Sequence, residues 1–183
     1  IVKYPHSASL AGKKGKFGFF STEAMLYKRI ADEMGINRED VEGEGLRFCR
    51  HPLVYLVEAA DDICYEIMDI EDAHKLKILS YDETEELLLG FFDEPTKANI
   101  HKRIIDEGVT DNNEKVVYMR ACVIGKLENE CVKGFVDNED ALLDGRFEGS
   151  LINGMPTLQR EAYLRCVDVS MKKIYHSKIV LDV

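Results

Sequence analysis

The chain has 183 residues, of which 45% are hydrophobic and 32% are charged, and its formal net charge is −10. This length fits one compact domain with its own core. The acidic balance argues against a dominant nucleic-acid-binding surface, although a local basic patch could still hold phosphates. The longest apolar windows fall far short of the roughly 20 residues that a membrane span needs, so we expect no membrane contact. The five cysteines, an odd number without a Cys-x-x-Cys pair, favour reduced thiols in a cytoplasmic protein.

The N-terminal arm, residues 1–20, is the one basic cluster of the chain, and its lysines lie among glycines and a proline. This composition predicts a loop arm. Residues 21–183 show the hydrophobic period of helices. The expected helices span residues 21–35, 52–77, 80–92, 95–107, 113–133, 137–144 and 157–176. No segment alternates with the period of a solvated strand, so we predict an all-α fold in a single helical domain over residues 1–183.

The helix expected at 52–77 carries acids close to apolar positions. On a helical wheel at about 100° per residue, an apolar stripe is predicted at Leu53, Leu56, Val57, Ala60, Cys64 and Ile67. Asp61 falls inside this stripe, and Tyr65 and Asp69 follow it one and two turns later. A buried carboxylate needs a cation or hydrogen-bond donors. The stripe therefore marks Asp61 as the sharpest candidate site residue.

Each candidate residue also has a structural interpretation. Asp61 could bind a metal or substrate, or form an ion pair or an interhelical cap. Lys3 and Lys16 could bind phosphate oxygens, helped by backbone N–H groups of nearby glycines, or belong to a mobile basic loop. Tyr65 could stack on a base or sugar, or fill a core position. Asp62 lies about 100° further round the helix, where a solvated or paired carboxylate is expected.

Several common site motifs are absent from the sequence. The five histidines form no zinc-ligand spacing such as His-x-x-x-His. A Walker A phosphate-binding loop, a Gly-x-Ser-x-Gly elbow and a glycine-rich dinucleotide fingerprint are missing as well. P-loop nucleotide hydrolysis and Rossmann redox chemistry are therefore disfavoured.

A longer pattern resembles a known family. The segments are His-Pro-Leu at 51–53, Leu-Val-Glu-Ala-Ala-Asp-Asp-Ile-Cys-Tyr at 56–65 and Asp-Ile-Glu-Asp-Ala at 69–73. Together they resemble the signature of the bacterial deoxyguanosinetriphosphate triphosphohydrolases, which are HD-domain metal-dependent phosphohydrolases. Lys-Tyr-Pro at 3–5 and Lys-Phe-Gly at 16–18 resemble two further family segments in the family's order.

The resemblance implies specific roles for these residues. Asp61 would be a metal ligand, while Tyr65 and Asp69 would line the nucleotide pocket. Lys3 and Lys16 would contact the triphosphate. The implied reaction hydrolyses dGTP or another dNTP to a deoxynucleoside and tripolyphosphate, with a divalent cation, Mg²⁺ or Mn²⁺. A homo-oligomer and a single-stranded DNA or nucleotide effector are further implied partners.

One part of the family pattern is missing, because no His is followed by Asp in this sequence. We therefore expect the chain to be the C-terminal part of a longer HD-domain enzyme, with no catalytic residue of its own and no activity alone. Two alternatives stay open. One is a non-catalytic helical domain that binds a nucleotide or a protein, and the other is an HD phosphohydrolase of another nucleotide.

Overall fold

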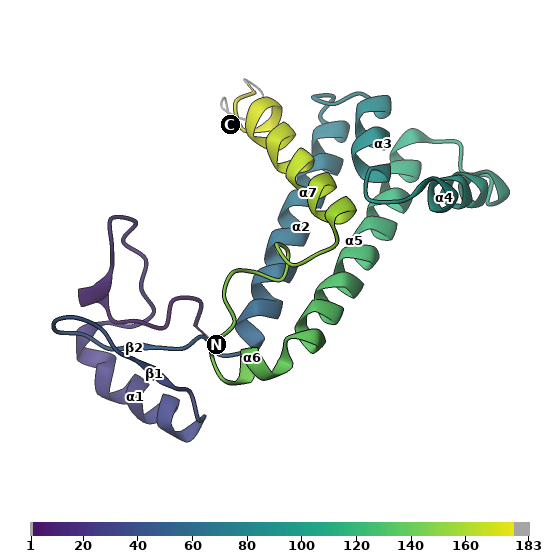
Figure 1. The fold of residues 1–183 in the computed structure, drawn as a ribbon. Coiled ribbons are helices and arrows are strands. Elements are labelled where there is room, and N and C mark those ends of the chain that lie inside the picture. The colour runs from purple at the N-terminus through teal and green to yellow at the C-terminus, as the bar shows by residue number, and fades with distance from the viewer. Residues whose placement is uncertain (1, 178–183) are drawn as a thin grey trace. The chain divides into compact units, whose positions relative to one another are not determined.

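A computed structural model describes residues 2–177 of the chain (Figure 1). Seven α-helices account for most of these residues, which confirms the predicted all-α fold. Contacts between Cα atoms group the chain into two compact units. Unit 1 comprises Ile1–Glu58 and Gly134–Leu151, and unit 2 comprises Ala59–Lys133 and Ile152–Val183. The single domain predicted for residues 1–183 stays a prediction. No helix within residues 2–177 has the length and apolar character needed to cross a membrane.

Unit 1 combines short elements with one three-turn helix. In chain order these are η1 (Ala8–Leu10), η2 (Ser21–Glu23), α1 (Ala24–Glu33), β1 (Arg38–Glu39), β2 (Arg47–Phe48) and α6 (Glu139–Leu143). Its core is formed by Phe19, Ala31 and Phe48. Tyr27 of α1 stacks on Phe19 with ring centroids 4.3 Å apart. This aromatic contact packs the end of the arm, residues 1–20, against α1.

The small antiparallel ladder of unit 1 was not predicted. Arg38 pairs with Phe48 and Glu39 with Arg47. A strand of two residues is too short to show a period of two, so its sequence carries no strand pattern. The ladder leaves the all-α class unchanged.

Unit 2 is built from helices. It contains α3 (Tyr81–Leu89), α4 (Glu94–Asp106), α7 (Thr157–Val169) and most of α2 (Leu53–Lys75) and α5 (Asn112–Asp137). Its largest fully buried side chains are Ile63, Ile67, Ile70, Leu79, Leu88, Phe91, Val116, Met119, Val123 and Leu127. α3 begins with a capping box, because the Ser80 hydroxyl accepts the Glu83 N–H while the Glu83 carboxylate accepts the Ser80 N–H.

The last predicted helix changes type near its end. α7 stops at Val169, and a single π-helical turn, η3 (Ser170–Ile174), follows it. The Tyr175 N–H donates to the Ser170 carbonyl at 3.0 Å, five residues back. Such turns occur as single bulges and are frequent at functional sites. Hydrophobic spacing gave no sign of this turn.

Candidate functional site

The buried face of α2 differs from the predicted stripe. Of the six stripe positions, only Ile67 is buried. The buried apolar residues of α2 are Val54, Tyr55, Ala59, Ile63, Ile67, Ile70 and Ala73. Asp61 lies on the opposite, exposed face with Val57, Cys64 and Tyr65. The expectation of a buried Asp61 is therefore wrong. Both faces of α2 carry apolar side chains, so composition alone could not fix which face turns inward.

Two other acids of α2 are the buried ones. Glu66 is 8% exposed and accepts a hydrogen bond from the Ser170 hydroxyl at 2.6 Å. Glu71 is 3% exposed and forms ion pairs with Lys75 and Arg120. Both pairings follow the rule that a buried carboxylate needs a partner. Neither glutamate was predicted as a site residue.

Asp61 presents its carboxylate on the exposed face of α2. Within residues 2–177 there is no group of three or more His, Cys, Asp or Glu side chains that could hold a metal ion. A protein site for Mg²⁺ or Mn²⁺ uses several oxygen ligands. One carboxylate does not complete such a site, so the described residues do not by themselves fit the implied cation. Asp61 can contribute one ligand.

Tyr65 and Asp69 continue the same ridge of α2. Tyr65 is 69% exposed, so its ring is available to stack on a ligand. Asp69 accepts a hydrogen bond of 2.5 Å from the hydroxyl of Tyr175, which directly follows η3. Asp61, Tyr65 and Asp69 are spaced by four residues, which is about 6 Å along a helix for each step. Unit 2 therefore brings these three predicted residues together and adds Tyr175.

The hydrogen bond to Asp69 changes the acidity of Tyr175. This bond, together with partial burial, raises the pKa of the phenol to about 12, against about 10 for an ordinary tyrosine. The neutral phenol is thus favoured in the folded state. Its stabilising contribution is complete below pH about 10 and is lost as the pH rises through about 12.

We predict that Asp69→Asn moves the Tyr175 pKa back towards about 10, because the neutral amide no longer disfavours the phenolate. NMR of ¹³C-labelled tyrosine rings across an alkaline titration measures this shift. Tyr81, whose hydroxyl donates to Glu85 at 2.6 Å, is the internal reference. Burial and this bond raise its pKa above that of Tyr175, so its ring should stay neutral in both proteins while Tyr175 titrates. An unchanged Tyr175 titration in the variant would contradict the assigned hydrogen bond.

Lys3 lies in a cluster of charges in unit 1. Its ammonium is 3.2 Å from Glu58 Oε1, and Arg50 Nη2 is 2.6 Å from Glu58 Oε2. Partial burial would raise the pKa of Glu58, but hydrogen bonds from Arg50 and Lys3 outweigh it and lower the pKa. The guanidinium of Arg50 also lies over the Tyr55 ring, 4.4 Å from its centroid. Two cations therefore face the Glu58 carboxylate.

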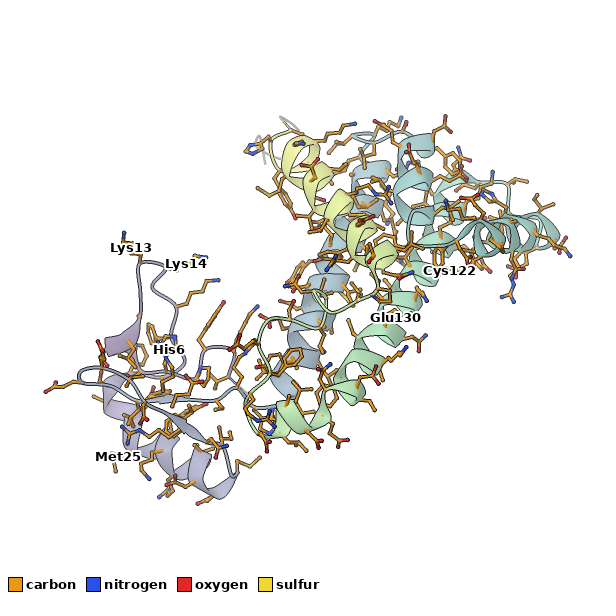
Figure 2. The ribbon with its side chains drawn as sticks, viewed as in Figure 1. His6, Lys13, Lys14, Met25, Cys122 and Glu130 are labelled. Carbon is orange, nitrogen blue, oxygen red and sulfur yellow. The ribbon has the colours of Figure 1, made fainter. Side chains whose placement is uncertain are left out.

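Lys16 lies beside the Lys3 segment in the same unit. Its ammonium is 5.4 Å from the centre of the Tyr4 ring. The Gly18 N–H donates to the His6 carbonyl at 3.0 Å. Lys13 and Lys14 lie at the tip of the loop between these two segments (Figure 2). The structure therefore brings the two lysine segments together.

The close packing around Gly18 explains why a glycine follows Lys16 and Phe17. A Cβ at this position would lie 2.2 Å from the Tyr4 carbonyl oxygen and 2.4 Å from a Val2 methyl. Because the first of these atoms is backbone, we predict that Gly18→Ala destabilises unit 1 by about 1–3 kcal/mol through overpacking. Urea unfolding measures the change. Gly12→Ala is the matched control, since nothing lies within 4 Å of its Cβ. Equal stability of the two variants would contradict the close approach.

Sequence reasoning missed the partners of the predicted residues. Glu58 lies inside the signature segment, yet its pairing with Lys3 was not foreseen. Ser170 and Tyr175 contact α2 residues 104 and 106 positions away. No local spacing could indicate such long-range pairs.

Comparisons with known proteins agree with the resemblance. A Pseudomonas aeruginosa deoxyguanosinetriphosphate triphosphohydrolase-like protein is 35% identical over 182 residues, which cover 97% of this chain and 39% of that protein. A protein of the same description from Synechocystis is 31% identical over 163 residues, 83% of this chain and 34% of its own length. A Yersinia enterocolitica deoxyguanosinetriphosphate triphosphohydrolase is 27% identical over 147 residues, covering 75% of this chain and 27% of that enzyme.

No family model matches the chain. It spans about two fifths of the length of the first relatives. The similarity to them nevertheless extends over 97% of the chain, at 35% identity. Over nearly all of its residues, the chain is thus homologous to a part of the longer proteins of the deoxyguanosinetriphosphate triphosphohydrolase family.

Proposed function

We propose that the chain forms the nucleotide-holding part of an HD-type dNTP triphosphohydrolase, which hydrolyses dGTP or another dNTP to a deoxynucleoside and tripolyphosphate. The observation that carries this proposal is the ridge of Asp61, Tyr65 and Asp69 on α2, because it offers three different interactions on adjacent turns. The names of the relatives support the hydrolase class.

The chemistry of each residue suits a part of the nucleotide. The exposed Tyr65 ring offers a stacking surface for a base or sugar. Asp69 and the Tyr175 hydroxyl form a polar pair that can exchange hydrogen bonds with the free hydroxyl of the deoxyribose. Asp61 provides one oxygen ligand of a Mg²⁺ or Mn²⁺ ion, and we propose that its other ligands come from outside this chain.

The lysine segments supply the positive charge that a triphosphate requires. The Lys3 side chain is 41% exposed and lies beside Glu58. Lys16 is exposed on the adjacent segment. Lysine ammonium groups are suited to phosphate oxygens as mobile point charges. We propose that both lysines offset charge on the triphosphate.

The test is a product assay on a polypeptide of the relatives' full length that carries this chain. With dGTP and Mg²⁺ or Mn²⁺, we expect deoxyguanosine and tripolyphosphate in equal amounts, separated by anion-exchange chromatography. A panel of the four dNTPs and the four NTPs then defines the substrate. Release of pyrophosphate or single phosphates instead would contradict the proposed reaction. Binding of dNTP without any product would favour the non-catalytic nucleotide-binding alternative.

A further inference from the structure

Two pairs of hydrogen-bonding residues link α2 to the turn η3 that follows α7 and to the residue after it. α2 and α7 lie side by side in unit 2 (Figure 1). Glu66 and Asp69 are three residues apart on α2. Their donors are the hydroxyls of Ser170 and Tyr175, which stand five residues apart. Acceptors three residues apart on α2 thus bind donors that are separated by the whole length of the π-helical turn η3.

The π-helical turn is what allows this match. In an α-helix of 3.6 residues per turn, positions five apart differ in direction by about 140° and cannot both face the same neighbour. η3 closes with the bond from the Tyr175 N–H to the Ser170 carbonyl, five residues apart. The wider turn returns residue 175 to the side of residue 170. Both hydroxyls can therefore reach α2.

Ser170 and Glu66 form the buried end of this arrangement. Ser170 is 0% exposed and Glu66 is 8% exposed. Burial raises the pKa of the Glu66 carboxyl, and the Ser170 hydroxyl partly offsets this effect. Tyr175, at the other end, is 41% exposed. The buried bond is therefore protected from water, whereas the Tyr175 bond lies at the surface beside the ridge of α2.

We propose that Glu66 and Ser170 are positioning residues, whose buried hydrogen bond sets the register of η3 and so holds the Tyr175 hydroxyl on Asp69. This role rests on the proposed function, in which Asp69 faces the nucleotide. Neither Glu66 nor Ser170 touches the ligand in this arrangement. They act through the backbone of η3.

Two other hydrogen bonds hold α7, so the proposal can be tested without displacing this helix. The Tyr163 hydroxyl donates to the Asp62 carbonyl at 3.3 Å, two turns before η3. The buried Gln159 amide also donates to the Phe91 carbonyl at 2.9 Å. Both bonds are independent of Ser170. Removal of the Ser170 hydroxyl should therefore leave α7 in place and change only the turn that follows it.

The experiment uses NMR at neutral pH on the 183-residue chain with labelled tyrosine rings. The wild-type chain should give nuclear Overhauser contacts between the Tyr175 ring and the Asp69 methylene protons. In Ser170→Ala these contacts should be lost, and in Ser170→Thr, which keeps the hydroxyl, they should persist. Contacts between Tyr81 and Glu85 in the same unit should be present in every variant.

Two further variants keep the result decisive. Thr84→Val removes another fully buried hydroxyl of unit 2, which donates to the Ser80 carbonyl at 2.8 Å, and should leave the Tyr175 contacts intact. Should Ser170→Ala fail to fold, the double variant Glu66→Leu with Ser170→Ala removes both polar partners and leaves no carboxylate unpaired. It should show the same loss.

Tyr175 contacts that survive in both Ser170→Ala and the double variant would overturn the positioning role. Their loss in Thr84→Val would also overturn it, because a general loosening of the unit would then explain the effect. The measurement needs no nucleotide. A failure of the proposed hydrolase function, seen as the absence of dNTP hydrolysis, is therefore distinguishable from a failure of this inference.

Discussion

Asp61→Asn is expected to lower dNTP hydrolysis by about 10³-fold or more in a polypeptide of the relatives' full length. Asparagine keeps the size of the side chain but removes the negative charge that a divalent cation requires. A bound cation contributes several kcal/mol to catalysis, and about 4 kcal/mol corresponds to 10³-fold in rate. The rate of tripolyphosphate release measures the effect. Binding of Mn²⁺, followed by electron paramagnetic resonance, should weaken in parallel.

The control for this substitution is Asp72→Asn on the same helix. Asp72 is 61% exposed at its side chain and lies 3.5 Å from Lys75, so loss of its charge should change little. Because Asp61 is itself exposed, the melting temperature should stay close to that of the wild type in both variants. Normal activity and Mn²⁺ affinity in Asp61→Asn would refute the ligand role.

Glu71→Ala is expected to give the largest loss of stability, about 2–3 kcal/mol. The Glu71 side chain is 4% exposed, with Arg120 Nη1 2.5 Å from its Oε2 and Lys75 Nζ 2.5 Å from its Oε1. Removing the buried carboxylate leaves two cations without their partner, Arg120 at 26% exposed and Lys75 at 50% exposed. Because water reaches both of them in part, the cost is below that of a fully buried pair. The Nε atom of Arg120 is buried and already lacks a hydrogen bond. Urea unfolding followed by circular dichroism measures the loss.

Two comparisons separate this effect from general damage. Asp32→Asn breaks the exposed pair with Lys28 and should cost at most about 1 kcal/mol. The double variant Glu71→Leu with Arg120→Met should recover much of the loss, since apolar side chains of similar volume replace the whole pair. A Glu71→Ala variant as stable as Asp32→Asn would show that the buried pair does not hold unit 2 together.

The sequence predicted helix ends well where a side chain marks them. Ser80 with Glu83 fixes the start of α3 through its own hydrogen bonds, and Gly35, with φ of +67°, follows the end of α1. Which face of α2 is buried could not be predicted in this way. Ile63 and Ile67 on one face and Val57 on the other are similar in hydrophobicity, and only the neighbouring elements decide which face is buried.

The candidate site likewise has a part that the sequence predicts and a part that it does not. The ridge of Asp61, Tyr65 and Asp69 was predictable because helical spacing and a local motif lie within one segment. The Tyr175 hydroxyl comes from 106 residues away. Its position depends on a single π-helical turn, for which hydrophobic spacing carries no signal. The local sequence pattern therefore predicts the residues of the ridge, whereas the hydrogen-bond partner of Asp69 depends on a tertiary contact.

Cys64 allows the accessibility of the exposed face of α2 to be measured with a thiol reagent, without an engineered label. Its thiol is exposed, one residue before Tyr65. Cys131 and Cys166 are buried, and burial raises the pKa of their thiols to about 11 and about 12. A maleimide reagent should therefore modify Cys64 well before either of these, as peptide mass spectrometry can measure. Any molecule that covers the Asp61 ridge would slow that reaction, so the protein carries a native footprinting probe beside its own candidate site.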